Sequence, residues 1–155
     1  MHELVPRHRR TPVVRARCII EREDGRLLVQ WDPKKEAYVF PGGRVEYSES
    51  IPLCLVREMK EEAGIIVEPD RLLYIVEVLE TDQPFHEILF YFTCNYKGNP
   101  RSRSKFVQLE WRTPEEFIEK LWPRSLAEVL AKQGKHAKPY YLVIVNGRIT
   151  FIKSL

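Results

Sequence analysis

Residues 43–65 read GRVEYSESIPLCLVREMKEEAGI, a loop that begins with glycine and runs into a helical segment. Ser50 is a favourable helix N-cap, and Pro52 falls in the first turn, where its missing N–H costs little. Gly64 is the residue type that commonly follows a helix C-terminus. The stretch therefore predicts a helix over residues 50–63.

Three acidic residues of this helix fall on one face. At about 100° per residue, Glu61 lies roughly 60° to one side of Glu58, and Glu62 lies roughly 40° to the other side. The adjoining face is apolar and is expected to dock on a sheet. It consists of Leu55, Val56, Met59 and Ala63.

Carboxylates clustered in this way repel one another, by a few tenths of a kcal/mol for each close pair on a helix. A hard divalent cation offsets the repulsion, because Mg²⁺ prefers carboxylate and water oxygens and is commonly shared with substrate phosphates. The alternative interpretation is a solvated acidic face, which is common in helices. Gly43 permits close approach of the backbone to a metal or phosphate and favours the first interpretation. Arg57 is expected to point away from the acids and to pair with Glu49.

The stretch resembles the Nudix box, and every fixed position of that pattern is filled. Chance agreement is on the order of one in a million at ordinary residue frequencies. The matching residues are Gly43, Glu49, Arg57, Glu58, Glu61, Glu62 and Gly64, with the aliphatic residues Met59 and Ile65.

The resemblance implies an α/β fold, an α/β/α sandwich around a mixed β-sheet. It also implies an enzyme that uses Mg²⁺ or Mn²⁺ to hydrolyse the diphosphate linkage of a nucleoside diphosphate joined to another group. By position, Glu58 and Glu62 resemble the family's principal metal ligands. Glu61 resembles a further ligand or the base, and the Gly43 carbonyl resembles the backbone ligand. Arg57 and Glu49 resemble its structural ion pair.

Outside the box, three residues are weaker candidates for substrate contact. Arg44 and Glu46 lie in the loop beside the expected metal, and His86 begins a strand where related proteins often carry a histidine. Each has an ordinary alternative as a polar surface residue.

Other features have structural interpretations that compete with functional ones. The basic loop 97–105 could contact phosphate, although solvated charge is the simpler interpretation, and it contains no acid. An additional catalytic acid could instead come from Glu110. Tyr38, Phe40 and Trp111 could stack on a base but are better explained as core aromatics.

The rest of the chain predicts strands with few helices in one domain, residues 13–155, after a basic tail at 1–12. A turn signal at residues 23–25 predicts a hairpin of residues 13–21 with 26–31. Asn146-Gly147 predicts a second hairpin. Further strands are expected at 38–40, 65–67, 72–79, 87–95 and 106–112, and helices from Thr113 and over 125–133.

Composition fits a globular protein of 155 residues with 44% hydrophobic and 30% charged residues and a net charge of +3. This mild charge suits a small anionic substrate better than nucleic acid. No apolar stretch approaches the roughly 20 residues that span a bilayer, and no signal pattern follows the basic start, so the cytoplasm is the expected location. The three cysteines form no CxxC pair and are expected to be buried reduced thiols.

Two other function classes compete with the hydrolase. A Nudix-fold module that only binds nucleotides would usually lack some box acids, and this chain lacks none. An isopentenyl-diphosphate isomerase-like activity would need a catalytic cysteine and a longer chain. The sequence leaves the substrate open among nucleoside triphosphates, oxidised deoxynucleoside triphosphates, ADP-ribose, nucleotide sugars and dinucleoside polyphosphates. It also leaves open a monomer or a homodimer.

Overall fold

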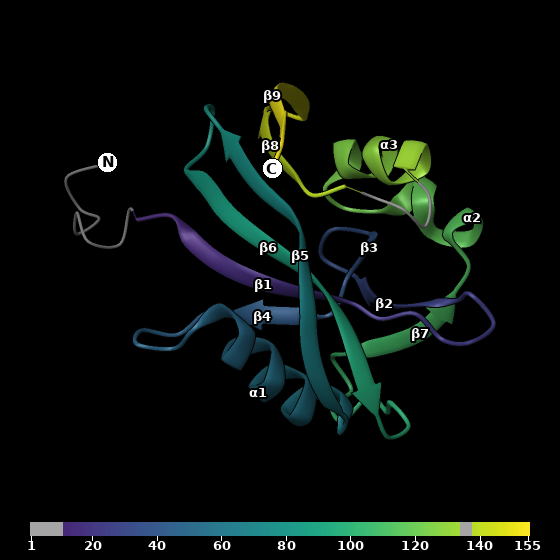
Figure 1. Cartoon of the computed structure of the whole chain (residues 1–155). Helices are drawn as coiled ribbons and strands as arrows, with labels where there is room; N and C mark the ends of the chain where they lie inside the picture. Colours follow the sequence, from purple (N-terminus) through teal and green to yellow (C-terminus); the bar gives the residue numbers. More distant parts are fainter. Residues whose placement is uncertain (1–10, 134–137) are drawn as a thin grey trace.

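The computed structural model describes residues 11–133 and 138–155, so most of the expected basic tail at 1–12 lies outside the described residues. Six strands form the larger sheet in the order β4-β1-β6-β5-β8-β9 (Figure 1). Their bounds are β1 Val13–Ile19, β4 Gly42–Arg44, β5 Ile66–Glu80, β6 Phe85–Lys97, β8 Tyr140–Val145 and β9 Arg148–Ser154. The β1–β6 and β5–β8 pairs are parallel and the other pairs are antiparallel, which confirms the mixed sheet.

A smaller antiparallel sheet has the order β3-β2-β7. Its strands are β2 Leu27–Asp32, β3 Ala37–Val39 and β7 Gln108–Arg112. The predicted hairpin of residues 13–21 with 26–31 is therefore wrong in its pairing, because β1 and β2 belong to different sheets. The turn itself forms, with Gly25 N donating to Arg22 O at 2.9 Å, and a single bridge joins Glu21 to Leu27 before the strands diverge.

Helix α1, Ile51–Ala63, begins and ends as predicted. The Ser50 hydroxyl accepts a hydrogen bond from Leu53 N, and Gly64 adopts the left-handed conformation with φ of 67°. Its buried face consists of Cys54, Leu55, Met59 and Ala63. The apolar stripe therefore docks the helix on the sheet and leaves its acids on the other side.

Most remaining elements follow the sequence prediction, but the strands expected at 65–67 and 72–79 form one continuous strand, β5. Thr113 and Glu116 form a capping box for α2, Pro114–Phe117, which continues into a 3-10 helix at Ile118–Lys120. Helix α3 covers Arg124–Gln133. The β8–β9 hairpin turns at Asn146 and Gly147, both with positive φ. No described helix is long and apolar enough to cross a membrane.

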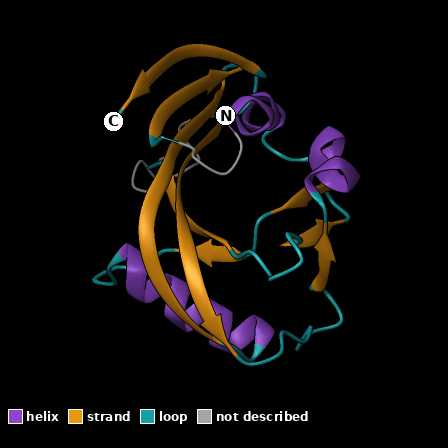
Figure 2. Cartoon of the chain, turned by 45° about the vertical axis from the view of Figure 1, so that its right-hand side comes forward, coloured by secondary structure: helices purple, strands orange, loops and turns teal. Residues whose placement is uncertain are grey.

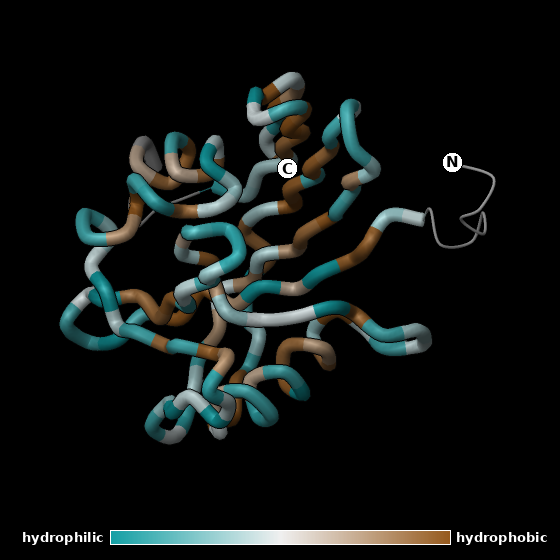
Figure 3. The backbone as a smooth tube through the Cα atoms, turned by 180° about the vertical axis from the view of Figure 1, so that it is seen from behind, coloured by the Kyte–Doolittle hydropathy of each residue, from teal (hydrophilic) through white to brown (hydrophobic). Residues whose placement is uncertain are grey.

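Two hydrophobic clusters lie on opposite faces of the larger sheet. One joins the sheet to α2 and α3 and includes Phe117, Leu126 and Leu142; the other joins it to α1 and includes Leu55 and Met59. The sheet thus lies between α1 on one side and α2 and α3 on the other (Figure 2). Hydrophobic residues concentrate in the strands and hydrophilic residues in the connecting loops (Figure 3). This arrangement is the expected sandwich.

All three cysteines are buried and free, as the sequence predicts. The Sγ atoms of Cys18 and Cys94 lie 3.1 Å apart across β1 and β6. Cys54 lies on α1 and belongs to the same hydrophobic cluster as Cys18 and Cys94. Burial raises the pKa of the Cys54 thiol to about 12, which keeps it protonated.

Candidate active site

The edge strand β4 brings two glycines against neighbouring groups. At Gly43, a Cβ atom would lie 2.3 Å from Cδ of Glu58, so the Glu58 carboxylate occupies the space that a side chain would need. At Gly42, with φ of +152°, a Cβ atom would lie 1.9 Å from the carbonyl oxygen of Ala16 in β1. Glycine is therefore required at one position by the fold and at the other by the approach of a carboxylate.

Glu62 lies one helical turn after Glu58, with its carboxylate beside that of Glu58. Burial, and then the charge of Glu58, raise the pKa of Glu62 to about 7. The Glu62 Oε2 atom is buried without a hydrogen-bond partner in the described structure. Buried polar atoms normally have partners, and hard divalent cations bind carboxylate oxygens. The donor set and the unpartnered oxygen therefore fit a divalent cation.

Glu61 departs from the expected cluster of three acids. Its side chain is 61% exposed, and its Oε2 lies 3.3 Å from Nη1 of Arg57. Within the residues that the structure describes, no three His, Cys, Asp or Glu side chains gather as a metal site. The helix thus presents Glu58 and Glu62 as a partly buried pair, with Glu61 turned toward solvent.

Arg57 joins the acids to the preceding loop. Its Nε donates to Glu49 Oε2 at 2.6 Å, and its Nη1 donates to Glu58 Oε1 at 2.9 Å. The expectation that Arg57 points away from the acids is therefore wrong, because the branched guanidinium reaches both groups at once. Its Nη2 also donates to the Arg44 carbonyl at 3.2 Å. Hydrogen bonding from Arg57 lowers the pKa of Glu49 to about 2.

The loop candidates Arg44 and Glu46 lie near this ion-pair network. The Arg44 side chain is exposed and only its backbone carbonyl contacts Arg57. Glu46 is 66% exposed in its side chain and lies 3.7 Å from the Arg57 guanidinium. Both side chains are therefore accessible from solvent at the entrance of the loop.

His86 lies with a different set of partners. Its Nε2 lies 2.7 Å from Glu77 Oε2, and Tyr141 OH donates to the other oxygen of Glu77 at 2.6 Å. The following residue, Glu87, alternates to the opposite face of β6 and accepts a hydrogen bond from Arg15 Nε at 2.6 Å. The strand period thus places Glu87, and not His86, on the face of the sheet where the Arg15 side chain lies.

Arg15, Arg17 and Glu87 were not among the residues predicted from the sequence to be functional. All three are on the interior strands β1 and β6, and Arg17 and Glu87 are buried. The signal that could have identified the two arginines is the sequence VVRARCI of β1, where they alternate with small and apolar residues in a buried strand.

The basic loop after β6 packs across the C-terminal end of α1. The backbone amides of Arg101 and Arg103 donate to the carbonyls of Ala63 and Glu62, at 3.0 and 3.1 Å. The Arg103 Nη1 donates to the Lys60 carbonyl at 3.2 Å. The loop therefore satisfies carbonyl groups that a helix end leaves unpaired.

The remaining candidates are built into the small sheet and the core. Glu110 in β7 lies 3.4 Å from Arg112 Nε. Phe40 is 1% exposed in the main core, as the core interpretation requires. Tyr38 and Trp111 are partly buried and pack against the cores, each with a further ring contact. These aromatics are thus engaged with other rings of the protein.

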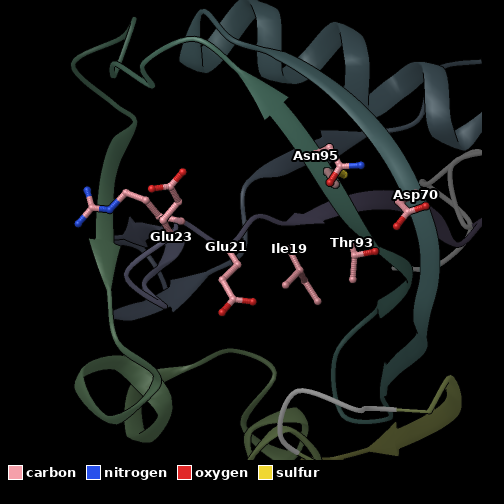
Figure 4. A pocket seen from close by; sticks show the side chains of 8 residues that line it. Ile19, Glu21, Glu23, Asp70, Thr93 and Asn95 are labelled. Carbon is pink, nitrogen blue, oxygen red and sulfur yellow. The ribbon is translucent and has the colours of Figure 1, made fainter.

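A pocket of about 470 Å³ opens beyond the end of β1 (Figure 4). Its polar lining consists of Glu21, Arg22, Glu23, Asp70, Thr93 and Asn95. Three of these residues are acids, so the pocket offers hydrogen-bond acceptors and disfavours the binding of a phosphate group. Glu58 and Glu62 do not line it.

Comparison with known proteins identifies the family. A family model described as NUDIX domain matches residues 11–133. A MutT-like protein of Streptomyces ambofaciens is 29% identical over 126 residues, which cover 79% of each chain. An ADP-ribose pyrophosphatase of Methanocaldococcus jannaschii is 34% identical over 89 residues, 56% of this chain and 53% of that protein. The crystal structure of the MutT protein from Bacillus halodurans matches with a TM-score of 0.75 and 23% identity, covering 91% and 96% of the two chains.

Proposed function

Since this chain belongs to the Nudix hydrolase family, we propose that it hydrolyses the diphosphate linkage of a nucleoside diphosphate joined to another group, with Mg²⁺ or Mn²⁺. The observation that carries the proposal is the partly buried carboxylate pair of Glu58 and Glu62, with one buried unpartnered oxygen on Glu62, held beside Gly43.

The cation would be held by Glu58 and Glu62, with Gly43 beside them and Glu61 as a further ligand or the base. A bound Mg²⁺ or Mn²⁺ supplies Lewis-acid chemistry, which activates water and neutralises developing negative charge. Because its side chain is exposed, Glu61 can turn toward the attacking water and accept its proton. Arg57 and Glu49 fix the helix against the loop, which keeps the acids in place.

The substrate would approach from the loop that carries Arg44 and Glu46. An ADP-ribose pyrophosphatase is among the relatives, so ADP-ribose is the first substrate to test. The panel should also contain a nucleoside triphosphate, a nucleotide sugar and a dinucleoside polyphosphate.

The test compares product formation by the wild type and by two variants with Mg²⁺. Glu62→Gln and Glu61→Gln should each lower kcat by about 100-fold or more, as expected for loss of a ligand or a base. Glu115→Gln, at an exposed position on α2, is the matched control and should retain wild-type activity. If the wild type binds these compounds but turns over none, the chain is a nucleotide-binding module and the proposed hydrolysis is wrong.

A further inference from the structure

Arg17 is a buried cation in β1, the second strand from one edge of the larger sheet. In the register of β1, it lies between Gly42 of β4 and Tyr91 of β6. Only 9% of its surface is exposed, which is unusual for arginine unless the guanidinium is paired. Burial lowers the pKa of Arg17, which reflects the cost of its charge in this position.

Within residues 11–133 and 138–155, the Arg17 guanidinium has no hydrogen bond and no ion pair. The titratable groups that influence its pKa are Tyr91, Arg15, Glu87 and Glu62. Of these, Glu87 is already bound to Arg15 at 2.6 Å. The remaining carboxylate near Arg17 is Glu62, whose Oε2 also lacks a partner.

Arg17 and Glu62 are therefore groups of opposite charge. Each affects the pKa of the other, but they form no ion pair. No contact of 4.0 Å or less joins them, although a direct ion pair would relieve both. Leaving a buried charge unpaired is costly, and the buried atom of this pair that lacks a partner is Glu62 Oε2. A ligand that carries a cation toward Glu62 and anionic oxygens toward Arg17 would satisfy both groups, and a metal-bound diphosphate is such a ligand.

The other arginines near the acid pair are committed to the protein. Arg57 is bound to Glu49 and Glu58, and Arg103 donates to the Lys60 carbonyl at the helix end. Arg15 is bound to Glu87. Among the described residues near the acid pair, Arg17 is thus a buried arginine whose N–H donors remain available to a ligand.

We propose that the Arg17 guanidinium binds nonbridging oxygens of the substrate's diphosphate, across from the carboxylates of Glu58 and Glu62. The inference rests on the proposed function for the identity of the ligand. It adds a phosphate-binding residue from β1, outside the Gly43–Ile65 stretch, and predicts that recognition of the diphosphate depends on this strand.

The experiment measures calorimetric binding of α,β-methylene-ADP, AMP and adenosine to the full chain, in EDTA and in Mg²⁺. The methylene bridge prevents cleavage at that linkage, so binding is read without turnover. Arg17→Gln should weaken α,β-methylene-ADP about tenfold to a hundredfold, as expected for loss of a charged hydrogen bond. Its affinity for adenosine should remain that of the wild type. Arg17→Lys should recover only part of the loss, because an ammonium group cannot form the forked contact.

Stability separates a ligand contact from a structural role. Without ligand, the unfolding midpoint of Arg17→Gln should stay within about 4 °C of the wild type, because the substitution removes no hydrogen bond or ion pair between described residues. Arg26→Gln, an exposed arginine on the turn after β1, is the matched control and should change neither affinity nor midpoint.

Two outcomes overturn the inference: equal affinity of Arg17→Gln and wild type for α,β-methylene-ADP, or equal loss of adenosine and α,β-methylene-ADP binding. If Arg17 is needed for diphosphate binding but the wild type hydrolyses no substrate, the inference stands and the proposed hydrolysis fails. If Arg17→Gln hydrolyses substrate and binds α,β-methylene-ADP as the wild type does, the proposed hydrolysis stands and the inference about Arg17 fails.

Discussion

Adjacent glycines in β4 meet different neighbours, and substitution should separate their roles. In Gly43→Ala the new methyl group meets the flexible end of Glu58, which can move aside. We expect a modest stability loss of about 1 kcal/mol but a fall in activity of about 100-fold, because the carboxylate is displaced. In Gly42→Ala the methyl group meets the backbone of Ala16, which cannot move freely, so the loss of stability should be about 3 kcal/mol or more.

Urea unfolding and kcat, measured on both glycine variants, test this distinction. A Gly43→Ala variant with wild-type kcat would contradict the placement of Glu58 in the reaction centre. A Gly42→Ala variant as stable as Gly43→Ala would show that β4 adjusts its backbone, contrary to the close contact with β1.

The ion pair of Glu49 with Arg57 should give stability a specific pH dependence. The hydrogen bond from Arg57 lowers the pKa of Glu49 to about 2, from an ordinary value of 4.5. A depressed carboxyl pKa contributes stability above pH 4.5, and this contribution is lost as pH falls through about 2. Glu49→Gln should therefore be less stable than the wild type near neutral pH, and the difference should shrink below pH 4.5. Urea unfolding at several pH values checks this, and a constant difference down to pH 2 would contradict it.

Among the elements, α1 was predictable from sequence because its determinants are local. Ser50 and Gly64 define its ends, and its apolar stripe repeats with the helical period. The partners of β1 were not predictable from the turn that follows it. This strand pairs with β4 and β6, which are more distant in sequence than β2. The orientation of Arg57 also depended on tertiary contacts, since Glu58 and Glu49 both lie within reach of its guanidinium.

Helix α1 should be sensitive to its N-terminal cap. Ser50→Ala removes the acceptor for Leu53 N and should cost about 1 kcal/mol of unfolding free energy. Ser50→Asp keeps an acceptor and adds a negative charge at the helix N-terminus, so its stability should equal or exceed that of the wild type. Thermal unfolding of the three proteins distinguishes them. Equal loss in both variants would mean that the serine hydroxyl contributes more than a cap.

The candidate site depends on the molecule as a whole, because its groups come from separate parts of the chain. Sequence spacing brought Glu58 and Glu62 together on one helix. The position of Arg17 became evident only when β1 was placed between β4 and β6. A residue whose neighbours are supplied by strand order cannot be assigned from local periodicity, even where its alternation with apolar residues indicates a buried strand.

The two hydrophobic clusters should therefore affect activity differently when each loses a buried leucine. Leu55 packs under α1 and Leu142 lies in the cluster on the opposite face of the sheet, and both are fully buried. Leu55→Ala and Leu142→Ala should each lower unfolding free energy by about 2–5 kcal/mol. Only Leu55→Ala should also lower kcat per folded molecule, because the cavity lies beneath the helix that carries Glu58. Urea unfolding and active-site-normalised kcat provide the comparison. An equal fall in kcat for both variants would mean that the acid pair is positioned by the entire core rather than by the packing of α1.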